Sequence, residues 1–444
     1  MNTFGMKVKA RCFIEYDSVA DLIDIEFEEL ARPVLHIGGG SNLLFTDDFK
    51  GTVLHSRINF IEILDGCSLT GRISAVPFAS AKCSQNIEAA AAPVKAEGVD
   101  GMPPRGLSQS DWGVKGEIVE DDAPTDTKVF VSVGAGVVFD DFCDWAAKEG
   151  LWGVENLSYI PGEVGASAVQ NIGAYGVEVK DVINKVYSYD TQEEEFVNFD
   201  VSECGYGYRD SIFKNPEIKG RYIVTHVVFA LSRTPQPRLE YGHLREAVAN
   251  IASLSSESRC VPETPSHSVG SSRSDSGAEK SLTPALIRKV IIKIRKEKLP
   301  EPSVMGSAGS FFKNPVISAE HFARIEAAAK AEHGPDYKVP HYVLNEPAIP
   351  TGPTPDPSSV ISGEGGARAE KSPMIKIPAA WMIEQCGWKG RRSGNAAVYD
   401  KQPLVIVNYT GEAYPEEIIS LEKRIIESVK KKFDIVLHPE VDHI

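Results

Sequence analysis

The sequence predicts a compact fold of mixed strands and helices that is interrupted by insertions. Short apolar runs that end in glycine turns, as at 34–45, are typical of strands joined by tight turns. Two other segments, 139–149 and 415–433, space their apolar residues at helical intervals. Three segments of weak pattern break this series, at about 67–127, 253–280 and 350–371. Because chemically distinctive stretches lie on both sides of each one, we interpret them as insertions and not as domain linkers.

The composition limits the class of protein. With 444 residues the chain is long enough for two or three domains, and its hydrophobic fraction of 42% is ordinary for a globular protein. A net charge of −15 without a basic stripe disfavours nucleic acid and anionic membranes as partners. Seven scattered cysteines without a C-x-x-C pair argue against a disulfide framework or zinc cluster and for a reducing compartment. No apolar run has the length of a signal peptide core or a membrane span, so we expect a soluble cytoplasmic protein.

In the first half of the chain, apolar runs and turn residues define the elements. The predicted strands are 34–37, 43–45, 129–133, 182–189 and 196–199. Residues 139–149 are predicted to form a helix with one apolar face, and Gly150 ends it. That face comprises Phe139, Phe142, Cys143 and Ala146.

In the second half, low-complexity segments separate the predicted elements. The serine-rich segment 253–280 cannot bury a core, so we expect it to be mobile and replaceable by a Gly-Ser linker. Thr283 is expected to cap a helix that starts at Pro284 and reaches about Lys296. Residues 415–433 are predicted to form an amphipathic helix, followed by a closing strand at 434–437. The expected buried stripe of this helix is Ile418, Ile419, Ile425, Ile426, Val429 and Phe433.

The run 159–176 (YIPGEVGASAVQNIGAYG) is the most distinctive stretch of the chain. It is nearly uncharged and rich in glycine, which loses the most backbone entropy on folding and is therefore not selected for helix or strand stability. Its amide pair, Gln170 and Asn171, can supply donors and acceptors inside an apolar run. A buried turn between core strands is the alternative, but the length of the run favours a loop that lines a ligand.

Consecutive glycines at 38–40 form a second candidate ligand site. Their backbone N–H groups can point into one concavity, which suits phosphate, although a plain tight turn is the alternative. The run lacks the G-x-G-x-x-G spacing before a helix, and Gly134 and Gly136 lack the third glycine. A Rossmann nucleotide site is therefore not supported.

Three polar residues in unusual surroundings are candidates for chemistry. Arg209 lies between Tyr208 and Asp210 in a glycine- and aromatic-rich segment, so a guanidinium held in place is as plausible as a surface one. Ser310 has small neighbours that would let its hydroxyl approach a ligand, although the G-x-S-x-G elbow is absent. Glu440, taken alone, would be interpreted as a surface acid.

Six motifs in order resemble the MurB family, UDP-N-acetylenolpyruvoylglucosamine reductase. The motifs are NTFG at 2–5, GGGSNLLF at 38–45, IPGEVGASAVQNIGAYG at 160–176, GYRDSIFK at 207–214, GSAGSFFKNP at 306–315 and AAWMIEQCGWKG at 379–390. The stretch 241–244 (YGHL) resembles the longer type of this family, which carries a tyrosine loop over the substrate. The three insertions remain unmatched.

This resemblance implies an α+β fold. It has a two-part FAD-binding region of the PCMH or vanillyl-alcohol-oxidase-like type and a C-terminal α+β substrate domain. The implied boundaries are 1–60 and 61–235 for the two FAD-binding parts and 236–444 for the substrate domain. The implied reaction is the NADPH-dependent reduction of UDP-N-acetyl-enolpyruvylglucosamine to UDP-N-acetylmuramate in peptidoglycan precursor synthesis. Non-covalent FAD carries the hydride, and the protein orients it and stabilises charge.

The resemblance also implies roles for individual residues. Arg209 would hold the substrate carboxylate and stabilise developing charge, Glu440 would lie near the same group, and Ser310 would protonate C2. The implied cofactor-binding residues are Gly38, Gly39, Gly40, Ser41, Asn42, Ile160, Pro161, Gly162, Gly165, Ala166, Gln170, Asn171 and Gly173. The implied substrate-binding residues are Tyr175, Tyr241, Lys298, Asn314 and Gln385, with no metal site.

Two departures and two alternatives remain open. Asp442 stands where the family often has a basic or neutral residue, so we carry no phosphate contact onto it. Gly39 stands where relatives have an acid, which the turn geometry should tolerate.

The alternatives are an FAD-dependent oxidase of the wider flavin family, and a non-catalytic nucleotide-sugar-binding protein. The oxidase would lack GSAGSFFKNP, and the binding protein would not need Ser310, Arg209 and Glu440 together.

Overall fold

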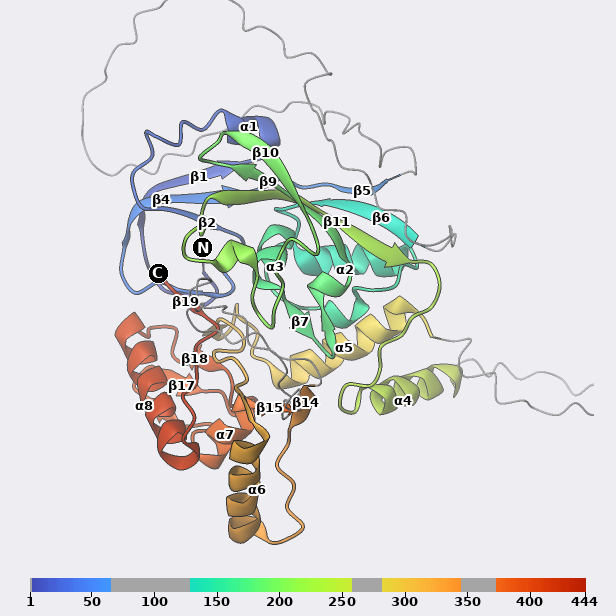
Figure 1. Cartoon of the computed structure of the whole chain (residues 1–444), viewed down its shortest axis with the longest axis vertical. Helices are drawn as coiled ribbons and strands as arrows, with labels where there is room; N and C mark the ends of the chain where they lie inside the picture. Colours follow the sequence, from blue (N-terminus) through green and yellow to red (C-terminus); the bar gives the residue numbers. More distant parts are fainter. Residues whose placement is uncertain (1, 65–127, 258–281, 345–372) are drawn as a thin grey trace, which may run out of the picture.

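The structure is a computed structural model, and it describes residues 2–64, 128–257, 282–344 and 373–444. Most of the predicted insertions, 67–127, 253–280 and 350–371, therefore lie outside the described residues. Two sheets form the upper half of the molecule, and helices α6, α7 and α8 lie below them (Figure 1). Among the described residues, no helix is long and apolar enough to cross a membrane.

The first sheet has three parallel strands in the order β1-β4-β2. The predicted strands at 34–37 and 43–45 are confirmed as β2 and β3, and the glycine turn joins them. The elements of this part are β1 (Ala10–Tyr16), α1 (Val19–Ile23), β2 (Val34–Ile37), β3 (Leu43–Leu44) and β4 (Phe49–Ser56).

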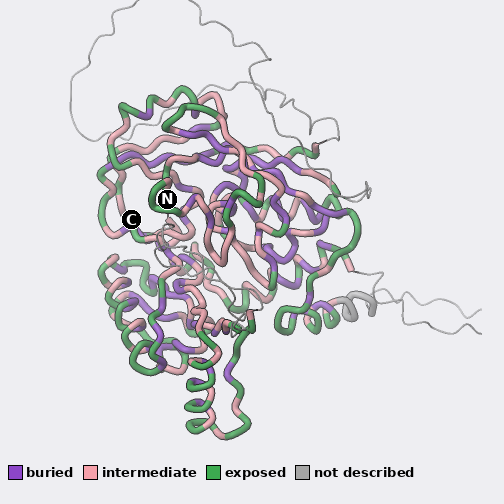
Figure 2. The backbone as a smooth tube through the Cα atoms, viewed as in Figure 1, coloured by how far each residue is buried: buried purple, intermediate pink, exposed green. Residues whose placement is uncertain are grey.

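The second sheet has five antiparallel strands in the order β10-β9-β11-β6-β5. Three predicted strands are confirmed as β6, β9 and β10. Its strands are β5 (Ile61–Leu64), β6 (Lys128–Gly134), β9 (Ile183–Asp190), β10 (Glu195–Asp200) and β11 (Tyr222–Ser232). Figure 2 shows that buried residues follow these strands and the helices beside them.

Helix α2 (Phe139–Lys148) packs on this sheet as its apolar spacing predicts. All four residues of the predicted face are buried, and the ring centroids of Phe142 and Phe229 on β11 lie 4.6 Å apart. Gly150 has φ +69°, a backbone conformation that glycine adopts without steric cost, and the helix has ended at this point.

The prediction that 159–176 is a loop throughout is wrong, because Val164–Gln170 form helix α3. A Cβ added at Gly165 would lie 2.8 Å from the Cβ of Ala135, so this glycine lets the helix approach the end of β6 closely. Glycine thus serves helix packing here, although it disfavours an isolated helix. The rest of the run forms turns and the short hairpin of β7 (Gly173–Ala174) and β8 (Val177–Glu178).

Helices α4 (Leu244–Glu257) and α5 (Pro284–Lys298) pack against each other beside Trp152. Thr283 caps α5 as predicted, since its side chain accepts a hydrogen bond from the backbone N–H of Leu286. The predicted start of the mobile segment at 253 is wrong by a few residues, because α4 continues to Glu257. Residues 258–280 of that segment lie outside the described residues.

The C-terminal part surrounds a core that includes Phe4, Phe311 and Phe312. Two small sheets, β12-β18-β17-β16 and β13-β15-β14, join three helices here. The elements are β12 (Gly306–Ser307), β13 (Val316–Ser318), α6 (Ala319–His333), β14 (Tyr342–Leu344), β15 (Met374–Lys376), α7 (Ala379–Gln385), β16 (Arg392–Ser393), β17 (Ala396–Val398), β18 (Ile406–Asn408), α8 (Pro415–Phe433) and β19 (Asp442–His443).

Helix α8 has the predicted bounds, but its buried stripe differs slightly. Ile419 and Ile426 are only partly buried, whereas Leu421 and Glu422 are buried. The closing strand predicted at 434–437 is wrong. Asp434 ends α8 in a left-handed conformation, and the next residues have no strand partner in the described chain. Ile435 and Leu437 are buried while Val436 is 44% exposed, so the strand-like alternation reflects burial and not a hydrogen-bonded ladder.

The chain ends at β19, which pairs in parallel with β3. Asn42 strengthens this pairing, because its side-chain amide donates to the carbonyl of Glu440 and its own carbonyl accepts from the N–H of Asp442. The C-terminal tail therefore lies against the glycine turn that follows β2. This contact joins residues that are nearly 400 positions apart in the sequence.

Candidate active site

Arg209 occupies the centre of the candidate site. It has φ +56° in the tight turn from Gly207 to Asp210, whose backbone groups hydrogen-bond each other in both directions. The guanidinium donates to the carbonyls of Asn171 and Gly173. A Cβ at Gly173 would lie 2.8 Å from Nη1 of Arg209, so glycine is needed for the guanidinium to lie there. The sequence alone left open whether the guanidinium lies at the surface. In the structure it is held by hydrogen bonds to two backbone carbonyls.

Glu440 is the carboxylate partner of Arg209. The Nε of Arg209 lies 2.8 Å from Oε1 of Glu440, and both side chains are less than one-fifth exposed. Burial raises the pKa of Glu440, while the charges of Arg209 and Lys214 oppose that increase. The backbone N–H of Glu440 donates to the carbonyl of Phe311, which places Glu440 beside the segment that carries Ser310.

Ser310 lies at the edge of this group. The carbonyl of its neighbour Phe311 accepts from Glu440, and the N–H of Phe311 donates to Leu404. The side chain of Ser310 is half-buried and has no hydrogen-bond partner among the described residues. A hydroxyl in this position remains available to a bound molecule.

Lys214 adds a second cation to the group. Its ammonium donates to Oε1 of Gln170 at 2.9 Å and to the carbonyl of Arg209. The amide of Gln170 in turn donates to Asp442 at 3.4 Å. Burial lowers the pKa of Lys214, and the carboxylate of Asp442 opposes this shift. Asp442, which departs from the family pattern, thus faces the amide of Gln170 and the charge of Lys214.

The two glycine-rich turns lie against each other. A Cβ at Gly38 would lie 2.9 Å from the Cβ of Ala166, and one at Gly162 would lie 2.9 Å from Oγ of Ser41. The hydroxyl of Ser41 donates to the carbonyl of Pro161. The two turns therefore pack closely where they meet, and a side chain at Gly38 or Gly162 would not fit. The sequence predicted both turns separately, and the structure brings them together.

Four of the five predicted substrate residues fall into three groups. Tyr175 and Tyr241 are in edge-to-face contact, with ring centroids 6.1 Å apart. Asn314 donates to the hydroxyl of Tyr208 and accepts from the N–H of Ala379, so it lies beside the Arg209 turn. Lys298 is exposed at the end of α5 and has no contact with these residues among the described interactions.

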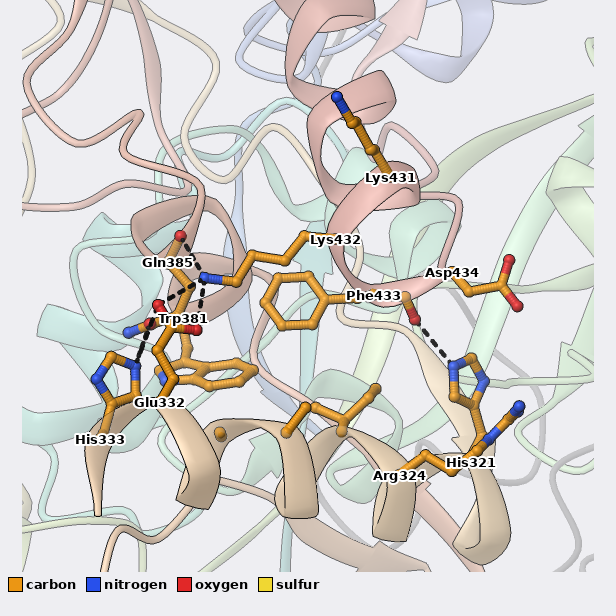
Figure 3. A pocket seen from close by; sticks show the side chains of 13 residues that line it. His321, Arg324, Glu332, His333, Trp381, Gln385, Lys431, Lys432, Phe433 and Asp434 are labelled. Carbon is orange, nitrogen blue, oxygen red and sulfur yellow. Dashed lines mark hydrogen bonds and ion pairs between the residues drawn. The ribbon is translucent and has the colours of Figure 1, made fainter.

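Gln385 is not brought to this group. Its side-chain amide contacts His333 and Tyr337, and it lines a separate pocket between α6, α7 and α8 (Figure 3). None of Arg209, Ser310 and Glu440 lines that pocket. The sequence motif around Gln385 gave no information on which side of α7 the amide would face, and this explains the difference.

Sequence reasoning missed several residues of the site. Lys376 lies over the ring of Tyr208 at 4.6 Å from the centroid, and burial lowers its pKa. Tyr342 stacks on Tyr241, with centroids 5.9 Å apart and a hydrogen bond between the hydroxyls. Arg295 donates to the carbonyl of Tyr159, one turn of α5 before Lys298. Its place on the buried side of an amphipathic helix is the signal that could have identified it.

The site therefore combines three cations, the partly buried carboxylates of Glu440 and Asp442, and the hydroxyl of Ser310, which has no hydrogen-bond partner among the described residues. Arg209, Lys214 and Lys376 provide local positive charge in a chain whose net charge is −15. Such a group suits an anionic ligand, because charge-assisted hydrogen bonds are stronger than neutral ones in a partly buried site. The facing glycine turns suit the phosphates of a nucleotide.

Comparisons with known proteins show which proteins the chain is similar to. Residues 301–444 match the model of the UDP-N-acetylenolpyruvoylglucosamine reductase C-terminal domain, and residues 115–195 match an FAD binding domain. The chain is 39% identical to the UDP-N-acetylenolpyruvoylglucosamine reductase of Bacteroides fragilis, over 100% of this chain and 97% of the relative. It is 34% identical to the enzyme of the same name from Porphyromonas gingivalis, over 100% of this chain and 96% of the relative. A crystal structure of the enzyme from Thermus caldophilus aligns with TM-score 0.49 and 18% identity, over 100% of this chain and 95% of that one.

Proposed function

The chain belongs to the UDP-N-acetylenolpyruvoylglucosamine reductase family, and we propose that Arg209, Ser310 and Glu440 form its catalytic group. The protein is an FAD-dependent oxidoreductase of peptidoglycan precursor synthesis, with NADPH as the hydride donor. Its reaction reduces the enolpyruvyl ether of a UDP-sugar to UDP-N-acetylmuramate. The contact between Arg209 and Glu440 supports the proposal most strongly, because it gathers residues from four distant segments at one partly buried point.

The chemistry of the substrate indicates a role for each of these residues. Bound FAD would supply the hydride, taken from NADPH, that is added to C3 of the enolpyruvyl group. The electron pair of the double bond then moves toward C2 and the carboxylate, and negative charge develops there. Arg209 is held by two backbone carbonyls and Glu440, so it can face this charge without reorganising. Ser310 then supplies the proton that completes C2.

Ser310 needs help to act as an acid, because an isolated hydroxyl gives up its proton reluctantly. The cations Arg209 and Lys214 lie near Glu440, which is next to the backbone of Phe311. Positive charge close to the serine would stabilise the alkoxide that remains after proton transfer. This is the physical reason for placing the proton donor in this segment.

A two-step anaerobic titration tests the proposed function. NADPH should bleach the flavin of the purified protein, and the enolpyruvyl substrate should then restore the flavin colour without oxygen. An oxidase would recover its colour only when oxygen is admitted. A non-catalytic nucleotide-sugar-binding protein would contain no flavin to bleach. The three readings therefore give three different absorption traces.

Tyr175, Tyr241 and Asn314 are proposed to contact the substrate, since they border the Arg209 group. The position of Lys298 at the end of α5 is compatible with a diphosphate contact, and we retain it as a proposal. We do not propose a substrate contact for Gln385, because its amide faces His333 and Tyr337.

The facing glycine turns are proposed to hold FAD, and Gly162→Ala tests this. Gly162 has φ +115°, which strains any residue with a side chain, and its added Cβ would press on Ser41 Oγ. Relief of this clash would shift the backbone of the turn away from its position in the wild type, so we expect FAD to bind about tenfold or more weakly. Titration of the apo-protein with FAD, followed by flavin fluorescence, measures this directly.

Gly220→Ala is the matched control for that variant. Gly220 also has positive φ, at +85°, but an added Cβ would meet nothing within 4 Å. This variant should share the backbone strain and keep wild-type FAD affinity. Equal FAD affinity in the two variants would remove the glycine turns from the cofactor site.

FAD is expected to be bound non-covalently. Neither the turn 38–42 nor the run 160–176 contains a histidine or cysteine that could attach it. Acid precipitation should therefore release all of the yellow colour into the supernatant. Flavin that stays with the precipitated protein would contradict this prediction.

The domain division and location are also proposals. Residues 1–60 and 61–235 contain both glycine turns, which supports an FAD-binding role for these parts. Residues 236–444 carry Ser310 and Glu440, which supports a substrate-binding role. The acidic sequence with scattered cysteines supports a cytoplasmic location, where peptidoglycan precursors would be made for cell division and cell shape.

A further inference from the structure

A buried imidazole is held between two carboxylates next to the glycine turns. Nδ1 of His55, on β4, lies 2.9 Å from Oε1 of Glu15 on β1. Nε2 of the same ring lies 3.0 Å from Oε1 of Glu163, immediately before α3. The side chain of His55 is 6% exposed and that of Glu163 is 11% exposed. None of these three residues is among those proposed above for the reaction.

The hydrogen-bond geometry indicates the charge of the ring. A neutral imidazole has one N–H donor and one lone pair, whereas an ionised carboxylate can only accept. With a carboxylate on each nitrogen, both contacts are favourable only when both nitrogens carry protons. Burial alone would lower the pKa of His55, but the hydrogen bonds and charges of Glu163 and Glu15 raise it. The pKa of Glu15 is correspondingly lowered by its hydrogen bond to His55.

Other polar groups around the ring do not replace this charge. His36 on β2 is buried, which lowers its pKa to about 4, so it is neutral and hydrogen-bonds Tyr16. Arg57 approaches Glu15 at 3.5 Å but is more than half exposed, so solvent screens its charge. The remaining face of the His55 ring stacks on Phe13. His55 is therefore the buried cation that balances Glu163.

Glu163 lies directly beside the first glycine turn. A Cβ added at Gly38 would lie 3.3 Å from its Oε2, and one at Gly39 would lie 3.7 Å from its Oε1. A carboxylate in this position repels any anion that binds to the turn, unless a neighbouring cation offsets it. In the described residues, His55 is the group that contacts Glu163 and can carry that cation.

We propose that protonated His55 is a positioning residue of the cofactor site, which holds Glu163 against the Gly38 turn and offsets its charge so that the diphosphate of FAD binds. This inference rests on the proposed function, because it takes these turns as the diphosphate site. Loss of the ring proton leaves one N–H for two carboxylates and adds one negative unit beside the diphosphate. FAD affinity is then coupled to the protonation of His55.

The sign of the pH effect follows from the raised pKa of His55. The imidazolium persists above the ordinary histidine value of about 6.5 and is lost as the pH rises further. FAD should bind tightly at about pH 6 and about tenfold more weakly at about pH 9. The tenfold change is the effect expected from the repulsion between the diphosphate and one uncompensated buried charge at short range. The same proton stabilises the fold, and this contribution is present at low pH and disappears over the same rise.

Titration of the full-length apo-protein with FAD, followed by flavin fluorescence from about pH 6 to pH 9, tests this. His55→Gln should bind FAD about tenfold more weakly than wild type at the acidic end and show no further loss with rising pH. Glu163→Gln removes the charge instead of its counter-charge, so it should keep tight binding and also lose the pH dependence. His226→Gln is the control, since His226 is an imidazole in the same part of the chain that contacts Thr225 and two aromatic rings and no carboxylate among the described residues.

The outcomes separate this inference from the function it rests on. Wild-type protein that binds FAD with the same affinity across this pH range overturns the inference and leaves the proposed function intact. A His55→Gln profile that matches wild type also overturns it. If His55→Gln does not fold, the wild-type protein and Glu163→Gln still test the inference. FAD affinity should fall with rising pH in the wild type and should not depend on pH in Glu163→Gln. Wild-type protein that binds no FAD at any pH contradicts the proposed function itself.

Discussion

Ser310→Ala is expected to slow the transfer of reducing equivalents from the flavin to the substrate by at least about a hundredfold. General acids contribute typically about 10²–10⁴-fold, and alanine cannot donate a proton. Reduction of the flavin by NADPH should remain nearly unchanged, because that half-reaction needs no proton at C2. Stopped-flow absorbance of each half-reaction separates the two rates. Ser310→Cys should retain slightly more activity than alanine, because a thiol can still donate.

The interpretation of Ser310 depends on a control in the same segment. Ser303 is exposed and precedes the motif, so Ser303→Ala should leave both half-reactions at the wild-type rate. If Ser310 were only a small packing residue beside Phe311, Ser310→Ala would also leave the rates of both half-reactions nearly unchanged. An unchanged second half-reaction in Ser310→Ala would remove this serine from the mechanism and weaken the roles of Arg209 and Glu440, which rest on the same family motifs.

Arg209→Lys is expected to slow substrate reduction by about 10²–10³-fold, the usual loss when one charge-stabilising donor is removed. Lysine keeps the positive charge but lacks the planar set of donors that reaches Asn171, Gly173 and Glu440 together. The loss should appear mainly in kcat with the enolpyruvyl substrate, because the charge that Arg209 faces develops only in the transition state. The rate of flavin reduction by NADPH should change far less.

Arg221→Lys provides the matched control for this change. Arg221 also forms a close contact with a carboxylate, 2.9 Å from its Nε to Oδ1 of Asp190, but it lies just before β11 and Asp190 ends β9. It should leave kcat unchanged and lower stability, because buried Asp190 loses the planar set of donors that Arg221 supplies. Equal losses of kcat in both variants would mean that Arg209 acts through general stability and not on the substrate.

Structural reasons explain why some predicted site residues are together and others are not. The proposed catalytic residues lie in one region because the backbone of the C-terminal tail pairs with two segments, at Asn42 and at Phe311. No local pattern in the sequence reports such pairing. Family motifs identified Arg209, Ser310 and Glu440, but the same reasoning also selected Gln385, whose amide faces a different pocket. A motif transfers residue identity, whereas the direction of a side chain depends on what packs around its helix.

The sequence by itself determined the elements whose pattern is local. The apolar spacing of α2 and α8, the cap of α5 and the two glycine turns were all predicted, because each depends on neighbours within a few residues. Only the tertiary structure decided that Val164–Gln170 are helical and that the tail pairs at β19 and not at 434–437. Gly165 has no Cβ, so it lets α3 pack closely against Ala135, and a strand forms only where a second strand can accept its N–H groups. The contact of His55 with two carboxylates arises in the same way, since it joins residues that are 40 and 108 positions apart.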